Sequence, residues 1–443
     1  MSARMQLAEW VLARIGDRAE SEVRIVGGTS ALTRFANSFI HQNVGEEGDT
    51  VSLRVAVDGR VASGTTSNTE PEALSRFVDQ AIDRALLQPV DPDWPGLAEP
   101  APVHSIEHYD EETAAADPVA RAERVGSFVA AGGGMLAAGY CETTAAELVF
   151  ANSIGVRHEG RYTAAVLDGI HQTATSAGSG HAASSRLAEI DPVAVGTLAA
   201  RRAADSAEAH DVPPGEYEVV LAPECVATIG IFLGFYGFNA KLLIEGQSFA
   251  EIGEQQFDDH LTIVDDVTDP RAMGVGFDAE GTPRHAIELV ERGMTRAVVH
   301  DRRTAAKSGV RSTGHAVPGS EVHGPYPSAM FVRPGDESLE SLIGAVDRGI
   351  YVATFNYCRV LDPKSMAVTG LTRNGNFMIE QGAITGAISN MRFTQSFLNA
   401  LGPGRVAGVG DDNRWADSEF GPGLVHAPSL RLAGWHFTGG SSG

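Results

Sequence analysis

The chain has 443 residues, of which 43% are hydrophobic and 21% are charged, with 50 glycines and a formal net charge of −23. This composition is typical of a globular protein with room for two domains, and it excludes a collagen-like, coiled-coil or mainly disordered chain. The negative charge disfavours binding to nucleic acid or to anionic membranes. Three widely spaced cysteines exclude a disulfide framework.

Targeting and membrane signals are weak. Charged residues interrupt residues 1–20, so no apolar core of a signal peptide is present. The uncharged run at residues 225–240 is shorter than a membrane span and contains three glycines. We therefore expect a soluble, cytoplasmic protein without membrane association.

The first half of the chain alternates helix and strand signals. Helical spacing of apolar residues occurs at residues 5–15, 69–85 and 118–131. Thr69 and Glu72 predict a capping box for the second of these helices, and Asp117 predicts a cap for the third. Residues 51–62 alternate in polarity around Asp58-Gly59, which predicts a β-hairpin. The Pro-rich and Asp-rich residues 87–102 predict a connecting loop.

The second half is dominated by strand signals. A domain boundary is predicted at residues 212–215, where Val-Pro-Pro-Gly follows a helix that begins near Pro192. Strands are expected at residues 217–221, 261–264, 296–299, 329–332, 377–380 and 383–388, and helices at residues 223–243 and 338–347. We therefore predict an α+β fold, with an N-terminal α+β domain over residues 1–211. A C-terminal domain dominated by antiparallel sheet is predicted over residues 212–443.

A series of short motifs follows a fixed order along the chain. They are Leu-Thr-Arg-Phe-Ala-Asn-Ser at 32–38, Ala-Asn-Ser-Ile-Gly-Val at 151–156, Gly-Gln-Ser-Phe at 246–249, Leu-Thr-Ile-Val-Asp-Asp at 261–266, Phe-Asp-Ala-Glu-Gly-Thr-Pro at 277–283, Ser-Thr-Gly-His-Ala at 312–316 and Phe-Met-Ile-Glu-Gln-Gly at 377–382. In order and spacing this series resembles the TldD/PmbA family, the bacterial and archaeal proteins once described as modulators of DNA gyrase. The resemblance extends over nearly the whole chain.

The resemblance implies a division of roles between two kinds of subunit. A TldD-type member is a zinc metallopeptidase that acts on small or unfolded peptides, and it pairs with a TldE-type, or PmbA-type, partner. Its HExxxH motif lies on the helix that opens the second half, where two imidazoles on one face bind zinc and the glutamate acts as general base. In this chain that helix covers residues 224–238, and no histidine occurs between His210 and His260. The chain therefore resembles the TldE type, or a TldD-related subfamily that has lost the metal.

These observations lead to one main expectation and one alternative. We expect a TldE/PmbA-like subunit of a TldD/TldE-type zinc metallopeptidase complex, involved in proteolysis or peptide maturation. No catalytic, cofactor-binding or metal-binding residue is expected in this chain, and zinc is expected in a TldD-like partner. The chain should form a dimer with that partner or with itself and take part in handling a peptide substrate. The alternative is an independent hydrolase or peptidase that uses a different residue set.

Two polar clusters could bind a metal. His104-Ser-Ile-Glu107-His108 matches the inverted zinc motif H-x-x-E-H, but it follows two prolines and lacks a helical pattern. We interpret it as an exposed loop or strand end. The second cluster consists of Asp265, Asp266, Asp278 and Glu280. Because its spacing matches no known ligand loop, we interpret it as a strand end and a tight turn whose carboxylates cap backbone N–H groups.

Two cysteines are further candidates, as nucleophiles or metal ligands. In TldD-type members a cysteine of the second half is the third zinc ligand, which draws attention to Cys358 and Cys225. Without a histidine pair one thiolate cannot hold zinc tightly, so both are expected to be buried, inert thiols.

The remaining candidates are glycine-rich segments and aromatic residues. Gly178-Ser179-Gly180-His181 and Gly132-Gly133-Gly134 match neither a phosphate loop nor a nucleophile elbow, and we interpret them as turns. Aromatic residues gather on the opening helix of the second half, at Phe232, Phe235, Tyr236 and Phe238. They are interpreted as core, with a subunit contact as the alternative, since they lie where the family keeps its catalytic face.

Overall fold

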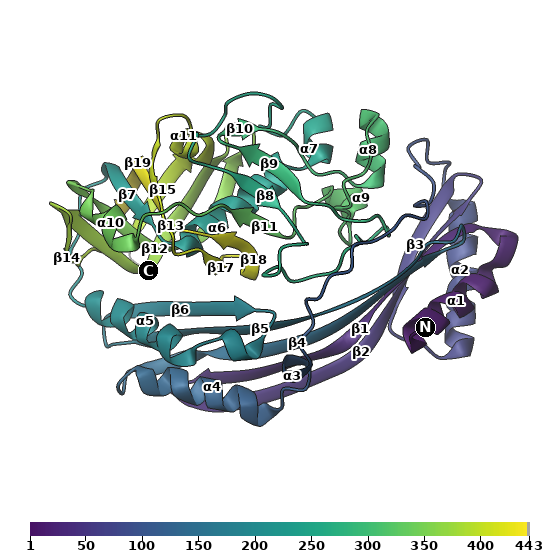
Figure 1. The fold of residues 1–443 in the computed structure, drawn as a ribbon, viewed down its shortest axis with the longest axis horizontal. Coiled ribbons are helices and arrows are strands. Elements are labelled where there is room, and N and C mark those ends of the chain that lie inside the picture. The colour runs from purple at the N-terminus through teal and green to yellow at the C-terminus, as the bar shows by residue number, and fades with distance from the viewer. Residues whose placement is uncertain (441–443) are drawn as a thin grey trace.

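The computed structural model describes residues 1–440 and has two lobes (Figure 1). The N-terminal lobe is built on one sheet of six antiparallel strands in the order β3-β2-β1-β4-β5-β6. Its strands are β1 (Glu20–Ala36), β2 (Phe39–Val57), β3 (Arg60–Thr66), β4 (Leu136–Asn152), β5 (Arg157–Gln172) and β6 (Ala177–Ser184). These long strands curve beneath the C-terminal lobe (Figure 1).

Helices cover the face of this sheet that points away from the C-terminal lobe. They are α1 (Ala3–Ile15), α2 (Pro71–Leu87), α3 (Glu111–Ala114), α4 (Pro118–Ala131) and α5 (Pro192–Asp205), with short turns η1 (Gly16–Arg18) and η2 (Leu187–Glu189). Val23 and Ile25 of β1 pack against α1 and α2, and Phe35 packs against Phe128 of α4. Because side chains alternate along a strand, these odd-numbered residues share one face. The even-numbered residues of β1, such as Glu22, are left to face the C-terminal lobe.

The C-terminal lobe contains two sheets. One has the order β10-β9-β8-β11-β18-β17, and the other has the order β12-β7-β19-β15-β13-β14, with β16 paired to β19. The strands are β7 (Gly215–Leu221), β8 (Ile263–Asp265), β9 (Ile287–Glu291), β10 (Met294–Thr295), β11 (Met330–Val332), β12 (Arg348–Asp362), β13 (Ala367–Glu380), β14 (Ala383–Ala387), β15 (Met391–Ser396), β16 (Val406–Val409), β17 (Arg414–Ser418), β18 (Gly421–Ala427) and β19 (Leu430–Gly440). The helical elements are α6 (Pro223–Phe232), η3 (Leu233–Gly237), α7 (Ala240–Ile244), α8 (Arg302–Ser308), α9 (Ser320–His323), α10 (Leu339–Gly344) and α11 (Phe397–Leu401).

An additional pairing of β12 with β13 closes β12, β7, β19, β15 and β13 into a ring. Closure leaves these strands without an open edge, and their inward side chains form a core. Trp435 is fully buried there against Phe355, Phe393 and Phe397. The C-terminal lobe therefore offers a rigid base for the elements that border the first sheet.

The α+β class and several local predictions are confirmed. Asp58-Gly59 joins β2 to β3 and Gln381-Gly382 joins β13 to β14, and all four residues have positive φ angles between 50° and 77°. This is the backbone that a two-residue hairpin of primed type requires. Asp117 caps α4 by accepting the N–H of Ala120. The division into domains at residues 212–215 stays a prediction, although β7, the first strand of the second lobe, begins at Gly215.

Two helix predictions need correction. The capping box of Thr69 and Glu72 does not form: Glu70 is the N-cap of α2 and makes no side-chain cap. Pro71 takes the first helical position, where its missing N–H costs nothing, and this moves the start of the helix by one residue. The helix predicted at residues 223–243 is interrupted only at Phe238: α6 continues directly into the π-helical turn η3, which ends at Gly237, and Asn239 caps a separate helix, α7.

Two further predictions are wrong. Residues 296–299 form no strand and contribute only a bridge between Val299 and Asn239. Gly178-Ser179-Gly180-His181 is not a turn but the centre of β6. Its glycines let α5 approach, since a Cβ on Gly178 would lie 2.3 Å from the carbonyl oxygen of Ala199.

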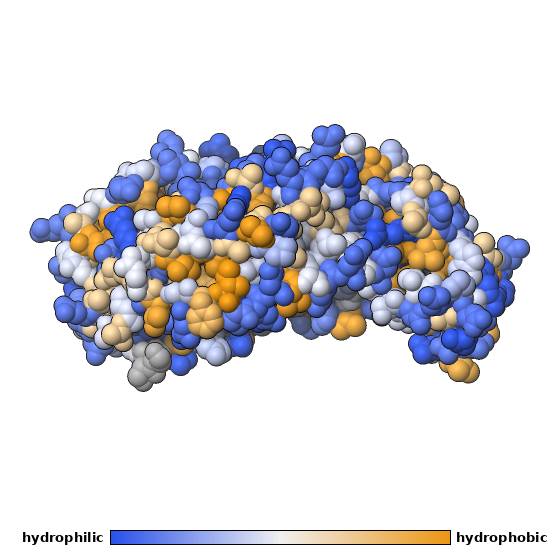
Figure 2. Space-filling view, turned by 90° about the horizontal axis from the view of Figure 1, so that it is seen from below, coloured by the Kyte–Doolittle hydropathy of each residue, from blue (hydrophilic) through white to orange (hydrophobic). Residues whose placement is uncertain are grey.

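The surface carries both polar and apolar residues, as the composition of 43% hydrophobic and 21% charged residues predicts. Seen from below, it mixes hydrophilic and hydrophobic residues, with the hydrophobic ones densest in the left half (Figure 2). Among residues 1–440, no helix is both long enough and apolar enough to cross a membrane.

Candidate functional site

Helix α6, where the resemblance places the family's metal, is buried along its whole length. Pro223 occupies its first turn, and Glu224 follows with only 4% of its surface exposed. A carboxylate this deeply buried needs charged partners, because burial alone makes its ionised form costly.

Two arginines supply those partners. Arg202 of α5 donates to Glu224 Oε1 at 3.1 Å, and Arg414 of β17 donates to Oε1 and Oε2 at 3.1 and 3.2 Å. Arg202 also donates to the hydroxyl of Tyr351 and to the carbonyl of Ser179. Burial raises the pKa of Glu224, but the two guanidinium groups outweigh it and lower that pKa to about 2. Glu224 is therefore a fixed anion that ties the two lobes together.

The side chains on α6 do not fit a zinc site of the HExxxH kind. The segment holds no histidine, and both oxygens of its carboxylate are occupied by arginines. Cys225 donates to the carbonyl of Val352, and burial raises its pKa well above the usual value. Burial and the nearby Glu419 also raise the pKa of Cys358. Both thiols are buried, as predicted, and stay protonated at neutral pH, whereas zinc binds thiolates.

The aromatic residues near α6 are mostly core. Phe232 and Phe238 are buried, Tyr236 is half-buried, and Phe235 is 36% exposed. Phe235 lies against Tyr236, with ring centroids 5.0 Å apart. Phe420, whose ring centroid lies 5.3 Å from that of Phe232, is 50% exposed, so the exposed aromatic surface near α6 includes Phe235 and Phe420.

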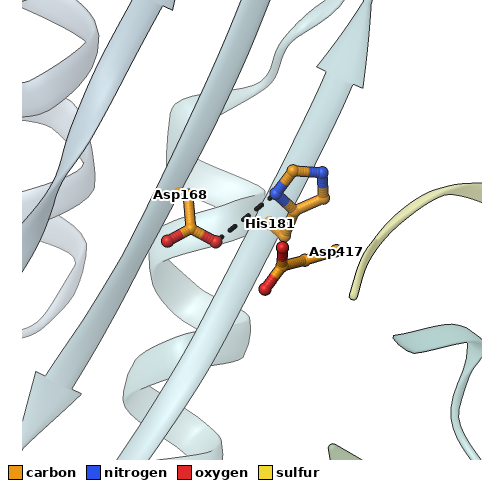
Figure 3. Close-up of side chains that lie close together, drawn as sticks. All are labelled: Asp168, His181 and Asp417. Atoms are coloured by element: carbon orange, nitrogen blue, oxygen red, sulfur yellow. Dashed lines mark ion pairs between the residues drawn. The ribbon is translucent and has the colours of Figure 1, made fainter. Parts of the chain in front are cut away.

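A second cluster lies between the lobes and joins the β5–β6 hairpin to β17 (Figure 3). Asp168 of β5 and His181 of β6 are direct cross-strand partners, and the His181 Nδ1 lies 3.4 Å from the Asp168 Oδ2. Asp417 of β17 approaches from the C-terminal lobe, and one ligand atom from each residue lies within 4.8 Å of the others. Burial, together with the nearby Asp168 carboxylate, raises the pKa of Asp417 to about 7.

Sequence reasoning missed this cluster. Asp417 is far from the other two residues in sequence, and His181 was expected in a turn. One signal in the sequence could have indicated it: glycines alternate with polar residues in Gly178-Ser179-Gly180-His181. In a strand this alternation places both glycines on one face, against a close neighbour, and both polar side chains on the other face. Only the tertiary structure brings Asp417 to this face.

The acidic residues at 265–280 lie at a strand end and in a tight turn, as predicted, and they have partners that the sequence did not indicate. Asp278 accepts the N–H groups of Glu280, Thr282 and Ala316, which confirms the tight turn. Asp265 is fully buried at the end of β8. It accepts from Arg284, at 2.9 Å, from the His315 ring, at 2.8 Å, and from the N–H of Ala329. Burial raises the pKa of Asp265, but His315 and Arg284 lower it to about 2.

A further charged contact lies between β1, β2 and the C-terminal lobe, beside a cavity of about 250 Å³. Arg54 Nη1 lies 2.9 Å from Glu22 Oε1 and 3.1 Å from Glu280 Oε1. Burial is the main reason that the pKa of Glu22 rises to about 7, and it exceeds the opposite effect of Arg54. Two carboxylates thus share one guanidinium group between the lobes.

The inverted zinc motif is not assembled. Its residues form no helix, and His104 and Glu107 are exposed, as predicted. His108 departs from the prediction, because it is buried and its two ring nitrogens lie within hydrogen-bond distance of the Gly274 and Asp269 carbonyls. Those contacts hold the loop against the C-terminal lobe and leave neither nitrogen free for a metal.

Comparison with known families identifies the chain's relatives. Residues 214–439, just over half of the chain, match the family model described as the PmbA/TldA metallopeptidase C-terminal domain, and residues 21–85 match domain 1 of the same metallopeptidases. The chain belongs to the TldD/PmbA family. The resemblance seen in the motifs is thereby confirmed, and the family is one of metallopeptidases.

Curated relatives match at moderate identity. A metalloprotease of Methanothermobacter thermautotrophicus is 29% identical over 217 residues, covering 47% of this chain and 45% of the relative. A metalloprotease TldD homolog of Buchnera aphidicola subsp. Schizaphis graminum is 27% identical over 236 residues, covering 50% of this chain and 48% of the relative. The chain thus spans about half the length of the curated relatives it matches.

Solved structures share the whole fold of this family member. TldE from Thermococcus kodakarensis superposes with a TM-score of 0.87 at 20% identity, covering 99% of this chain and all of that one. A candidate modulator of DNA gyrase from Thermotoga maritima gives a TM-score of 0.85 at 18% identity, covering 98% of this chain and all of that one. At these identities the likeness supports the fold alone.

Proposed function

We propose that this chain is a TldE/PmbA-like, non-catalytic subunit that pairs with a TldD-like zinc metallopeptidase in proteolysis or peptide maturation in the cytoplasm. The observation that carries the proposal is the chemistry of α6. The helix has no histidine, its Glu224 is held by Arg202 and Arg414, and its cysteine is a buried thiol. A helix built in this way holds a structural ion pair where a catalytic member needs metal ligands and a general base.

The family context supports the proposed partner. Relatives of this chain are named TldD homologs, and a TldE structure shares its fold over nearly the full length. We propose that the two kinds of subunit form one complex around a peptide substrate, with zinc in the TldD-like chain. A homodimer of this chain is the second form of assembly. The net charge of −23 favours a peptide over a nucleic acid as the molecule handled.

Sedimentation combined with peptidase assays tests this proposal. The chain should sediment as a dimer, either with itself or with a TldD-like chain of the same organism. Alone it should not cleave an unstructured peptide, and added to the partner it should change the rate of cleavage. A strictly monomeric chain that neither binds the partner nor alters its activity contradicts the proposal.

Phe235 tests where the subunits meet. Replacing it with alanine is expected to weaken pairing by about 2 kcal/mol, or roughly 30-fold, if this aromatic side chain is a central anchor of the interface. The matched control is Phe39→Ala, since Phe39 is 59% exposed but lies on the β1–β2 hairpin of the other lobe. Dissociation constants from sedimentation or calorimetry decide the point. If only the Phe39 variant lost pairing, the subunit contact would lie on the N-terminal sheet.

The alternative function, an independent hydrolase, has one observation in its favour. Asp168, His181 and Asp417 form a partly buried set of two carboxylates and an imidazole, none of which belongs to α6. A histidine beside a carboxylate is a common general base. Peptide cleavage by the isolated chain that disappears in Asp168→Asn would favour this alternative over the subunit.

A further inference from the structure

We propose that Asp168, His181 and Asp417 bind one divalent transition-metal ion, preferably Zn²⁺, which links the two lobes. This site shares no residue with α6 and does not depend on pairing with another subunit. From the sequence alone no metal-binding residue is expected in this chain, so the proposed site rests on the structure. Nitrogen and oxygen donors converge at this point from three strands (Figure 3).

The spacing of the donor atoms fits a small cation. The His181 Nδ1 and the Asp168 Oδ2 are 3.4 Å apart, and all three donors lie within 4.8 Å of one another. In a tetrahedral site with bonds of about 2.0 Å, neighbouring ligand atoms are about 3.3 Å apart. The first pair already has this separation, and a small rotation of the Asp417 side chain would bring in the third donor.

His181 indicates that a ligand is missing from its surroundings. Its side chain is only 2% exposed, yet neither ring nitrogen has a hydrogen-bond partner within residues 1–440. Buried polar atoms in folded proteins nearly always have a partner, because an unsatisfied one costs free energy. The ring directs Nδ1 toward the Asp168 carboxylate (Figure 3). A cation between them would use this nitrogen.

The local charges also call for a cation. Within the described part of the chain, neither Asp168 nor Asp417 forms a salt bridge with a lysine or an arginine. Arg202 and Arg414, on the neighbouring elements α5 and β17, pair with Glu224 instead. Two carboxylates this close repel each other in a partly buried site, and a cation between them would relieve that repulsion.

The donor set selects among cations. Imidazole together with carboxylates suits zinc, and to a lesser degree manganese or iron, whereas calcium and magnesium prefer oxygen donors alone. Among these metals the general order of stability places zinc above manganese and iron. Because Asp168 and His181 come from the N-terminal sheet and Asp417 from the C-terminal lobe, the bound ion would cross-link the lobes.

A second group of similar composition serves as a control. Asp258, Asp259 and His260 also bring donor atoms within 4.8 Å of one another, but Asp259 and His260 are exposed. The His260 Nδ1 is already hydrogen-bonded to Asp258 at 2.7 Å, and Asp258 also accepts from Val406. This group is satisfied without a cation and is not proposed as a site.

The test uses the full-length chain, stripped with a chelator and dialysed against Zn²⁺. Elemental analysis is expected to find one zinc per chain, and the melting temperature should rise with Zn²⁺. Asp417→Asn, which preserves the shape of the side chain, should weaken zinc binding at least tenfold and abolish the rise in melting temperature. His260→Ala should leave both unchanged.

Two outcomes would overturn the proposal: a wild-type chain that binds no zinc at saturating concentration, or an Asp417→Asn chain that binds zinc as tightly as wild type. Circular dichroism and the melting temperature without metal show whether each variant is folded. Should Asp417→Asn not fold, Asp168→Asn provides the same test from the other lobe. If His260→Ala abolished zinc binding and Asp417→Asn did not, the zinc would lie in the exposed group, and this outcome would also refute the proposal.

Discussion

Replacing Arg202 with methionine is expected to destabilise the chain by about 3–5 kcal/mol. Arg202 and Glu224 are 5% and 4% exposed, and their contact at 3.1 Å connects α5 of the N-terminal lobe to α6 of the C-terminal lobe. Methionine has a similar volume, so the main loss is electrostatic: the buried Glu224 carboxylate would keep Arg414 alone as a charged partner within residues 1–440. Removing one member of a buried pair costs far more than the pair itself contributes.

The midpoint of urea unfolding measures this effect, and a neighbouring residue provides the control. Arg201 has the same chemistry, but its side chain is 76% exposed and pairs with Asp205 across one helical turn. Arg201→Met should change stability by less than about 0.5 kcal/mol. Adding Glu224→Gln to Arg202→Met removes the stranded charge and should recover part of the loss. Equal stability of the Arg202 and Arg201 variants would show that the pair does not hold the lobes together.

The sequence predicted those features of the fold that depend on local chemistry. The Asp58-Gly59 and Gln381-Gly382 hairpins follow from residues that tolerate positive φ, and the start of α4 follows from an aspartate placed just before a proline. Each of these signals involves neighbours in the chain, so no tertiary contact is needed to interpret it. The α+β class follows in the same way from the sum of such elements.

The candidate sites depend on contacts between distant segments, and these could not be predicted from one sequence. The strand β6 contains two glycines that favour a turn when the sequence is considered in isolation. In the structure they pack against α5, where there is no room for a larger side chain. The partners of Glu224 come from positions 202 and 414. The spacing of residues along the chain does not indicate such distant pairs. The absence of a histidine pair on α6, in contrast, is visible directly in the sequence.

Glu22→Gln is expected to make the chain less sensitive to alkaline pH. Burial and, to a lesser extent, the nearby Glu280 raise the pKa of Glu22 from 4.5 to about 7, despite the proximity of Arg54 on β2 and Arg302 on α8. Between these two pH values the folded chain keeps a proton that the unfolded chain has released. The stability associated with Glu22 is therefore fully present below pH 4.5 and is lost as the pH rises through 7. A shift of this size corresponds to about 3 kcal/mol.

Urea unfolding of the wild type and the variant at pH 4, 6 and 8 measures this dependence. The free energy of unfolding of Glu22→Gln, relative to wild type, should rise by about 3 kcal/mol between pH 4 and pH 8, since glutamine has no charge to bury. Glu20→Gln is the matched control, because Glu20 lies on the same strand two residues away but is exposed. Its difference from wild type should stay nearly constant with pH. If the Glu22 and Glu20 variants show the same pH profile, Glu22 is not a buried acid held between the lobes, and the contact of β1 with Arg54 and Glu280 must be looser than the structure has it.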